Sequence, residues 1–366
     1  MDDALAGGAN MMGGEQRKKN GERQPVAVLA LLALSVSGCL HPVKAILRVD
    51  GPVFGDMAHN NNDRPIVAMP VDEVGRTGKG PHVAVIDVDG LLLNTNLTGP
   101  YSSGDNPVDV FREKLDAAMV DPTCTALVVR VNSPGGSVTA TDMMWRELQW
   151  FRQKTGRPVI ACLMDLACGG AYYLATASDL IVAHPTTVTG GVGVVLNLYN
   201  FRDALGAFSL VDQSIKAGAN IDLGSALKPL PPQAEKLLQE MADELHVRFR
   251  EVVRNRRCGA LPMDDTALDG RVFLASKALE HGLVDRIGYL PDAIAAAREL
   301  AGQPRAGTVL MHRTGDVART PYATTPNIPF QASLLPFSVP GLERSKLPTF
   351  LYLWQPDPTL ERLSGR

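Results

Sequence analysis

From His82 onward, short apolar runs alternate with longer stretches in which apolar residues recur at helical spacing. The short runs predict four buried strands, at Val83–Val88, Ala126–Val131, Pro158–Leu163 and Leu180–Ala183. The longer stretches predict helices at Pro107–Val120, Met143–Phe151, Ala234–Val253 and Asp292–Leu300. This alternation predicts an α/β domain with a mainly parallel sheet, because parallel neighbours need a long crossover connection.

Length and composition fit one large domain or two modest ones, with extensions at the ends. The chain has 366 residues, and its hydrophobic content of 45% argues against wholesale disorder. Its 36 basic residues nearly balance its 39 acidic ones. This balance gives no global field that would attract nucleic acid, so no nucleic-acid partner is predicted.

The cysteines show neither a CxxC pair nor a metal-like spacing with histidine, so no metal site and no cofactor are predicted. Three of the five lie in or beside apolar stretches and are interpreted as small buried hydrophobic residues: Cys124, Cys162 and Cys168.

The N-terminal region is typical of an export signal. A basic segment around Arg17–Arg23 precedes the apolar run Val26–Leu34, which is short for a membrane span. The following Val36-Ser37-Gly38-Cys39 resembles a bacterial lipobox, in which Cys39 would receive the lipid. We therefore expect a signal peptide over residues 1–39 and an envelope protein that lies outside the cytoplasm. A plain N-terminal membrane anchor is the alternative.

Two further segments flank the α/β domain, which is expected over residues 81–302. Residues 40–80 are predicted to be a linker, with Ala45–Val49 as a short strand. Residues 303–366 are predicted to be an irregular C-terminal extension. It ends in the apolar run Leu347–Trp354, interpreted as a strap over the core, with an edge strand or a subunit contact as alternatives.

Four short segments carry candidate chemistry. The strand ending at Val131 leads into Asn132-Ser133-Pro134-Gly135-Gly136, a turn whose glycines can expose backbone N–H groups to a developing oxyanion. The other three segments are Ala167–Asp179, Pro185–Val194 and Lys216–Asp222.

In this order the four segments resemble the S49 signal peptide peptidases of the ClpP/crotonase superfamily, over about Val83–Gly302. The resemblance implies a ClpP/crotonase-like spiral of ββα repeats. It implies that Gly135 and Gly136 form the oxyanion hole. It also implies a wall of the peptide groove at Thr189, Gly190 and Gly191.

Both catalytic positions of the family are replaced in this chain. The family's nucleophilic serine aligns with Gly169, and its general-base lysine aligns with Ile221. A serine–lysine dyad needs a hydroxyl and a neutral amine, and neither residue supplies one. The first hypothesis is therefore a non-catalytic homologue that binds peptides or acts as a scaffold.

Cys168 offers an alternative nucleophile. With the register shifted by one residue, Cys168–Tyr172 resembles the serine segment of the related stomatin-partner proteases. A thiol at a helix N-terminus can be acidic enough to attack a carbonyl. Its base would be Lys216 or His184, and such an enzyme would cleave membrane-derived or signal peptides.

A third class, acyl-CoA enzymes of the crotonase type, fits an exported chain poorly. The partners implied by the resemblance are extended peptides or signal-peptide remnants. Subunits of a homo- or hetero-oligomeric ring are implied as well, together with the membrane through the lipid anchor.

Overall fold

The computed structural model describes residues 64–72, 80–96, 98–99, 102–103, 105–257, 265–316, 318–324 and 350–354. The predicted lipid site Cys39 and the predicted strand Ala45–Val49 lie outside these residues. Within the described residues, no helix is both long enough and apolar enough to cross a bilayer.

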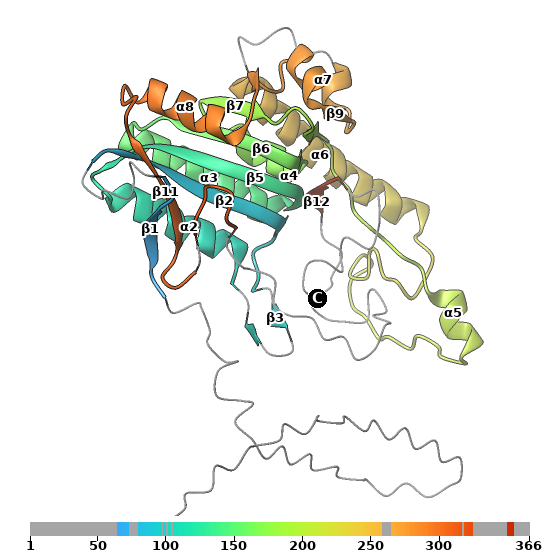
Figure 1. The fold of residues 1–366 in the computed structure, drawn as a ribbon. Coiled ribbons are helices and arrows are strands. Elements are labelled where there is room, and N and C mark those ends of the chain that lie inside the picture. Colours follow the sequence, from blue (N-terminus) through green and yellow to red (C-terminus); the bar gives the residue numbers. More distant parts are fainter. Residues whose placement is uncertain are drawn as a thin grey trace, which may run out of the picture. The chain divides into compact units, whose positions relative to one another are not determined.

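The main sheet has the strand order β1-β11-β2-β5-β6-β7-β10 (Figure 1). Every neighbouring pair in this order is parallel except β1 and β11, which run antiparallel. The strands of this path are β1 (Ile66–Pro70), β2 (His82–Leu92), β5 (Cys124–Ser137), β6 (Val159–Cys168), β7 (Leu180–Ala183), β10 (Arg286–Ile287) and β11 (Gly307–Arg313).

Three short strands extend the ends of β5 and β6. β8 (Val188–Gly190) runs parallel to the end of β6, and β9 (Val272–Leu274) pairs antiparallel with β8. β12 (Leu351–Leu353) pairs antiparallel with the last residues of β5. A separate pair is formed by β3 (Thr98–Gly99) and β4 (Ser102–Ser103).

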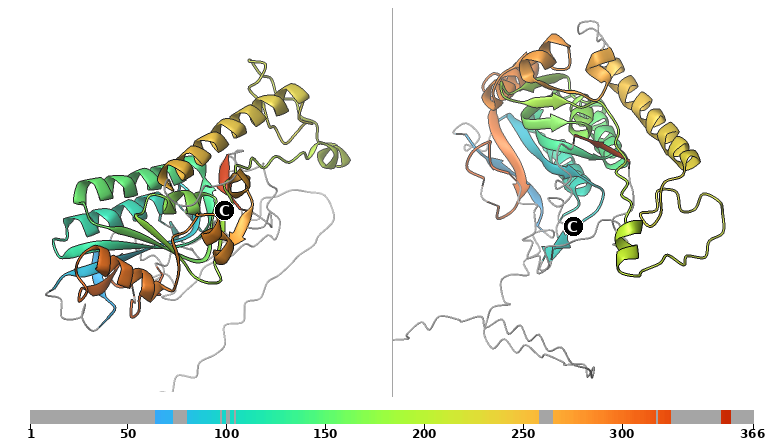
Figure 2. Two further views of the ribbon diagram at one scale, coloured as in Figure 1. Left: turned by 90° about the horizontal axis from the view of Figure 1, so that it is seen from above. Right: turned by 90° about the vertical axis from the view of Figure 1, so that its right-hand side faces the viewer.

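Helices cover both faces of the main sheet, as the left panel of Figure 2 shows. On β2, Ala84 and Ile86 join one core with helices α2 and α3, whereas Val83 and Val85 join a second core with α8. This division follows from the alternation of side chains along a strand. The helices are α2 (Pro107–Val120), α3 (Val138–Thr155), α4 (Gly170–Ala175), α5 (Arg202–Ala207), α6 (Pro232–Arg256), α7 (Ala275–Glu280) and α8 (Leu290–Leu300).

The ends of the helices follow from local sequence. Asn106 accepts a hydrogen bond from the backbone N–H of Val108 at 3.0 Å, and Pro107 occupies the first turn of α2. Ser137 caps α3 in the same way, and Gly156 ends it in a left-handed conformation with φ of 65°.

The predicted α/β class is confirmed, and every strand and helix predicted from periodicity is present. Beyond a register irregularity, β5 and β6 continue into a smaller layer, in which β12 pairs with β5 and β8 pairs with β6 and β9. Their extension is the spiral of ββα repeats that the family resemblance implied.

Three segments differ from the expectations. β5 continues to Ser137, although Asn132–Gly136 suggested a turn, because Gly135 and Gly136 still pair with the end of β2. β1 lies in the predicted linker, and β11 lies in the predicted irregular extension. Both are short, and β11 is fully buried beside β2, so long-range pairing rather than local pattern defines them.

A buried ion pair joins α2 to the central sheet. Lys114 Nζ lies 2.7 Å from Asp87 Oδ1, and both side chains are almost inaccessible. Burial and the neighbouring Asp87 carboxylate raise the pKa of Asp89 to about 6. The buried lysine charge therefore offsets negative charge that would otherwise stand unfavourably between sheet and helix.

Replacing Lys114 by methionine is expected to lower the free energy of unfolding by about 3–5 kcal/mol, because it leaves a buried carboxylate without its cation. Urea unfolding measures the change. The matched control is Lys236→Met, which removes an exposed i,i+4 pair with Glu240 and should cost less than about 0.5 kcal/mol. Equal losses in the two variants would contradict the assignment.

Candidate active-site groove

The junction between β6 and α4 is the centre of the candidate site. β6 ends at Cys168, α4 begins at Gly170, and Gly169 between them has φ of 54° and ψ of −122°. A sharp strand-to-helix turn of this kind is one that nucleophiles occupy in hydrolases. Position 169, predicted to correspond to the family's serine, lies at a turn of this kind, but glycine provides no reacting group.

The end of β5 lies next to this junction. The backbone N–H of Gly135 donates to Ser133 Oγ at 3.0 Å, so this predicted oxyanion donor already has a partner within its own turn. Gly136 lies opposite Tyr352 of β12. Gly135 lies opposite Leu353 in the same ladder, so of the two predicted donors Gly136 is the one paired with the residue whose carbonyl reaches the junction.

The predicted groove residues of β8 form hydrogen bonds with the strand-to-helix junction. Gly190 accepts a hydrogen bond from the N–H of Gly169 at 2.9 Å, and the buried Thr189 hydroxyl donates to the Ala167 carbonyl at 2.7 Å. The N–H of Gly191 donates to the Arg271 carbonyl at 2.9 Å. Farther along the chain, the backbone of Val195 pairs with that of Leu351 and forms the other edge of the groove.

The segment 350–354 runs between these two walls as an extended strand. Val138 N–H donates to the Phe350 carbonyl at 3.3 Å, and Trp354 N–H donates to the Pro134 carbonyl at 3.1 Å. On the other edge, the N–H and carbonyl of Leu351 pair with those of Val195, each at 2.9 Å. A strand held on both edges by backbone is the arrangement expected of a bound peptide.

The carbonyl group of Tyr352 lies against the glycines of the junction. Because hydrogen-bonded pairs alternate along an antiparallel ladder, the bonds at 350 and 354 place Tyr352 and Gly136 in the pair between them. A Cβ atom on Gly169 would lie 2.7 Å from the Tyr352 carbonyl carbon and would overlap its oxygen. The peptide carbonyl thus stands where a side chain at position 169 would begin.

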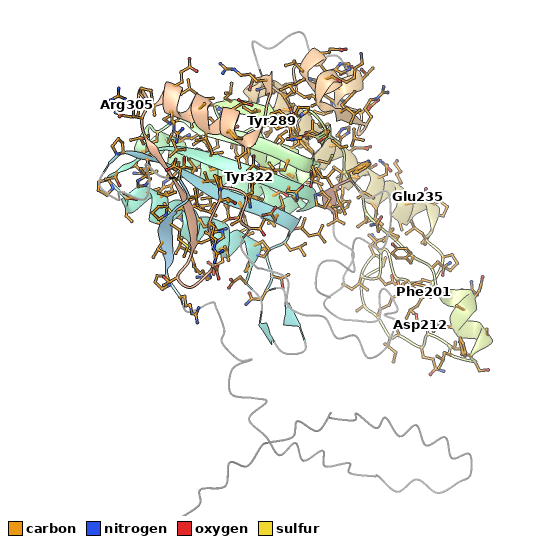
Figure 3. All side chains as sticks on the ribbon, viewed as in Figure 1. Phe201, Asp212, Glu235, Tyr289, Arg305 and Tyr322 are labelled. Carbon is orange, nitrogen blue, oxygen red and sulfur yellow. The ribbon has the colours of Figure 1, made fainter. Side chains whose placement is uncertain are left out.

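Ile221, at the predicted base position, belongs to a segment that protrudes from the domain. This segment, residues 197–228, includes α5 and is called the arm below; Figures 1 and 3 show α5, Phe201 and Asp212 away from the sheet. The Ile221 side chain is 71% exposed. Gly169, by contrast, is bordered by the backbone of Tyr352 and Leu353, so within one chain the exposed Ile221 side chain lies apart from the junction.

The Cys168 thiol is fully buried and donates to the Val188 carbonyl at 3.4 Å. Burial raises its pKa to about 12. Its two proposed bases have other partners, since Lys216 Nζ lies 2.5 Å from Asp222 and the His184 ring contacts Thr186 and Tyr289. These surroundings favour a neutral structural thiol.

The described part of the apolar run Leu347–Trp354 contains strand β12 and thus agrees with the edge-strand alternative. Sequence reasoning missed that this strand reaches the site, because its pattern carries no information about which sheet edge it meets. Within the described residues, no group of acidic, histidine or cysteine side chains could hold a metal ion.

Comparison with known proteins identifies relatives of the domain. A family model described as peptidase family S49 matches residues 151–303. A putative protease of Synechocystis is 33% identical over 58% of this chain and 74% of its own length. The chloroplastic serine protease SPPA of Arabidopsis thaliana and Protease 4 of Salmonella typhi are each 30% identical, over 63% and 68% of this chain.

The chain spans only part of some of these relatives, covering 34% of the Arabidopsis protein and 39% of the Salmonella protein. Among solved structures, a membrane-bound stomatin-specific protease, 1510-N, overlaps 60% of this chain and 80% of its own at 15% identity, with a TM-score of 0.37. That overlap is too weak to bear on function.

Substituting alanine for Gly169 is expected to weaken the attachment of β12. The positive φ costs roughly 1–2 kcal/mol for any L-residue, and the new Cβ would also collide with the Tyr352 carbonyl. Amide hydrogen exchange at Leu351 should therefore accelerate in Gly169→Ala. The control is Gly302→Ala, which has a positive φ of 64° but open space at its Cβ, and it should leave exchange at Leu351 unchanged. Unchanged exchange at Leu351 in Gly169→Ala would contradict the described collision.

Proposed function

This chain belongs to peptidase family S49, and we propose that within the family it binds extended peptides without cleaving them. It would act as a peptide-binding or scaffolding homologue in the bacterial envelope. Signal-peptide remnants and other membrane-derived peptides are the ligand class, because the groove is lined by backbone hydrogen-bonding groups and apolar residues.

One observation supports the proposed absence of cleavage. Gly169 occupies the strand-to-helix junction beside the Tyr352 carbonyl, and glycine places no side-chain atom there. Acyl transfer by a serine–lysine dyad requires a hydroxyl at this point and an amine to accept its proton. With glycine at 169 and isoleucine at 221, the chain supplies neither reacting group.

Peptide binding is supported by the backbone geometry of the groove. The end of β5 and the segment at Val195 present hydrogen-bonding groups on two sides of one extended strand. Recognition through backbone groups tolerates many sequences, because side-chain pockets alone then decide specificity. Such a groove keeps its binding capacity when the reacting groups are lost.

The competing function is a peptidase that uses Cys168, which adjoins Gly169 at the same junction. A thiol attacks as its thiolate, and a pKa near 12 leaves only a trace of thiolate at neutral pH. The sulfur donates its hydrogen bond to the Val188 carbonyl of β8. Peptide binding without cleavage therefore has the stronger support.

The proposal includes the location and assembly of the protein. A lipid on Cys39 would hold the domain at the membrane outside the cytoplasm. The arm exposes large apolar side chains, which mark interaction surfaces when they are contiguous; these are Phe208, Leu210, Val211, Ile215 and Ile221. A second subunit of a homo- or hetero-oligomeric ring would cover them, as the family resemblance implies.

The purified chain is expected to leave peptides intact. A peptide that copies residues 347–354, incubated with the chain and followed by mass spectrometry, should show no cleavage, whereas Protease 4 serves as the positive control for the assay conditions. Cys168→Ala and the matched buried-cysteine variant Cys162→Ala should behave like the parent. Cleavage by the parent that disappears only in Cys168→Ala would establish the cysteine protease instead.

Thiol labelling tests the state of Cys168 directly. At pH 8 a group with a pKa near 12 is ionised to about one part in ten thousand, so iodoacetamide should not modify Cys168 in the folded chain. In urea the same residue should react readily. Rapid modification of Cys168 in the folded protein, located by peptide mapping, would favour the rival function.

A further inference from the structure

We propose that His246 of α6 is a positioning residue of the groove. Its imidazole N–H holds the backbone at Val192 and thereby keeps the backbone of Val195 in the place where it pairs with an extended strand. This inference rests on the proposed function and deepens it, since it names the side chain on which one edge of the groove depends. It is carried by two hydrogen bonds from one ring nitrogen.

The segment that forms this edge has little regular structure of its own. It leaves β8 as Gly190-Gly191-Val192-Gly193-Val194-Val195 and then forms an isolated bridge between Val195 and Leu351. Gly190 and Gly191 have φ of 96° and 64°. Because glycine loses more conformational freedom on folding than any other residue, this edge needs contacts from outside to keep one conformation.

Two contacts supply that support. The N–H of Gly191 donates to the Arg271 carbonyl at 2.9 Å. One residue farther on, the Val192 side chain is fully buried, and the Val192 carbonyl lies 2.8 Å from His246 Nε2. The same nitrogen lies 2.9 Å from the Leu268 carbonyl. His246 therefore joins the groove edge to the segment that contains Leu268 and Arg271.

The hydrogen on this nitrogen follows from its two neighbours. Carbonyl oxygens only accept hydrogen bonds, so Nε2 must carry a hydrogen to bond with either of them. A neutral ring with its hydrogen on Nε2 and a doubly protonated ring both meet this requirement. The clamp formed by His246, Val192 and Leu268 therefore persists in both charge states of the ring.

Loss of the ring would leave two buried acceptors without this donor, since Val192 and Leu268 are both buried. A buried carbonyl that has lost its partner is unfavourable, because it has exchanged water for nothing. The glycine-rich segment is the part that can move to relieve this cost. Its movement would displace the Val195 backbone, which lies at the end of the same segment.

The histidine lies on a well-anchored part of α6. Phe249 and Val253, farther along the helix, are fully buried in the main core. Arg248 donates to Asp142 of α3 at 2.7 Å. A side chain that starts from a fixed helix can hold a loop in one position, so His246 is suited to position the groove edge.

The clamp also closes the base of the arm. The arm begins at residue 197, directly after the groove edge, and α6 follows it. Within the arm, the Phe201 N–H donates to the Ala226 carbonyl at 2.7 Å. Without the clamp, Val195 would lie between the bond at Gly191 and the arm, and movement of the arm would reach the groove edge.

Hydrogen exchange of the full chain separates the two edges of the groove. The amides of Val195 and Leu351 report on the edge assigned to His246, and those of Val138 and Trp354 report on the β5 edge. In His246→Leu, exchange at the first pair should accelerate at least about tenfold, because the segment loses its donor. The second pair should keep the parent rates.

The conservative variant His246→Gln tests the chemistry of the contact. A glutamine amide nitrogen donates two hydrogen bonds and should restore most of the protection at Val195 and Leu351. The control Glu244→Leu changes an exposed position on the same helix and should match the parent. A failure of glutamine to restore protection would refute the role of the donor.

The outcomes distinguish the inference from the proposed function. Equal acceleration at all four amides in His246→Leu would reduce His246 to a residue of general stability, and unchanged rates would also overturn its positioning role. Binding of a labelled peptide that copies residues 347–354 by the parent, followed by fluorescence anisotropy, tests the function separately. Selective acceleration in a chain that binds no peptide would keep the positioning role and overturn the function.

Nuclear magnetic resonance of the unaltered chain covers the case in which His246→Leu does not fold. With isotope-labelled histidine, the His246 ring should carry a hydrogen on Nε2 that exchanges slowly with water, and His246→Gln assigns the signal by its absence. A ring whose Nε2 lacks a hydrogen would refute the clamp, because such a nitrogen cannot donate to either carbonyl.

Discussion

Two glycines, Gly135 and Gly169, keep side chains out of the space through which the backbone of β12 runs. A Cβ on either residue would overlap the Tyr352 carbonyl oxygen. Gly136 serves the neighbouring contact in the same way, since a Cβ there would collide with the backbone of Leu92 at the end of β2. Close approach of backbone to backbone is therefore the condition for the groove and for the strand that lies in it.

The close approach of the β12 backbone also bears on the role of the oxyanion-hole geometry. A backbone N–H aimed at a carbonyl lowers a reaction barrier only if it binds the developing oxyanion more strongly than the resting carbonyl. In the proposed binding role no oxyanion develops, and the N–H of Gly136 would be one more hydrogen bond to a bound peptide. The same geometry would then contribute ground-state affinity alone.

Much of this fold was predictable from sequence, but the occupied groove was not. The buried runs in β2, β5, β6 and β7 are continuous enough to predict strands, and Asn106-Pro107 marks the start of α2. In β11 only Val309–Met311 form an apolar run, and β12 has three residues, so neither gave a strand signal; both become strands because distant partners pair with them.

The candidate site was likewise predictable from sequence only in part. Motif spacing was sufficient to select Gly169 and Ile221, and the turn at Gly169 agrees with the first. Spacing could not decide whether Cys168 is reactive, because that depends on burial, and burial is a property of the packed domain. It also could not indicate that Tyr173 and Phe249 contact the Tyr352 ring, since buried aromatic residues on helices are ordinarily core.

Strand periodicity finally links the register of β12 to the contacts of its central residue. Side chains alternate along β12, so Tyr352 directs its ring toward Tyr173 and Phe249 while its carbonyl lies beside Gly136 and Gly169. A slip by one residue would turn Leu351 or Leu353 toward these rings and would lose the hydroxyl contact with Leu245. Backbone hydrogen bonds alone would accept several registers, so the contacts of one side chain determine which carbonyl of β12 reaches the junction.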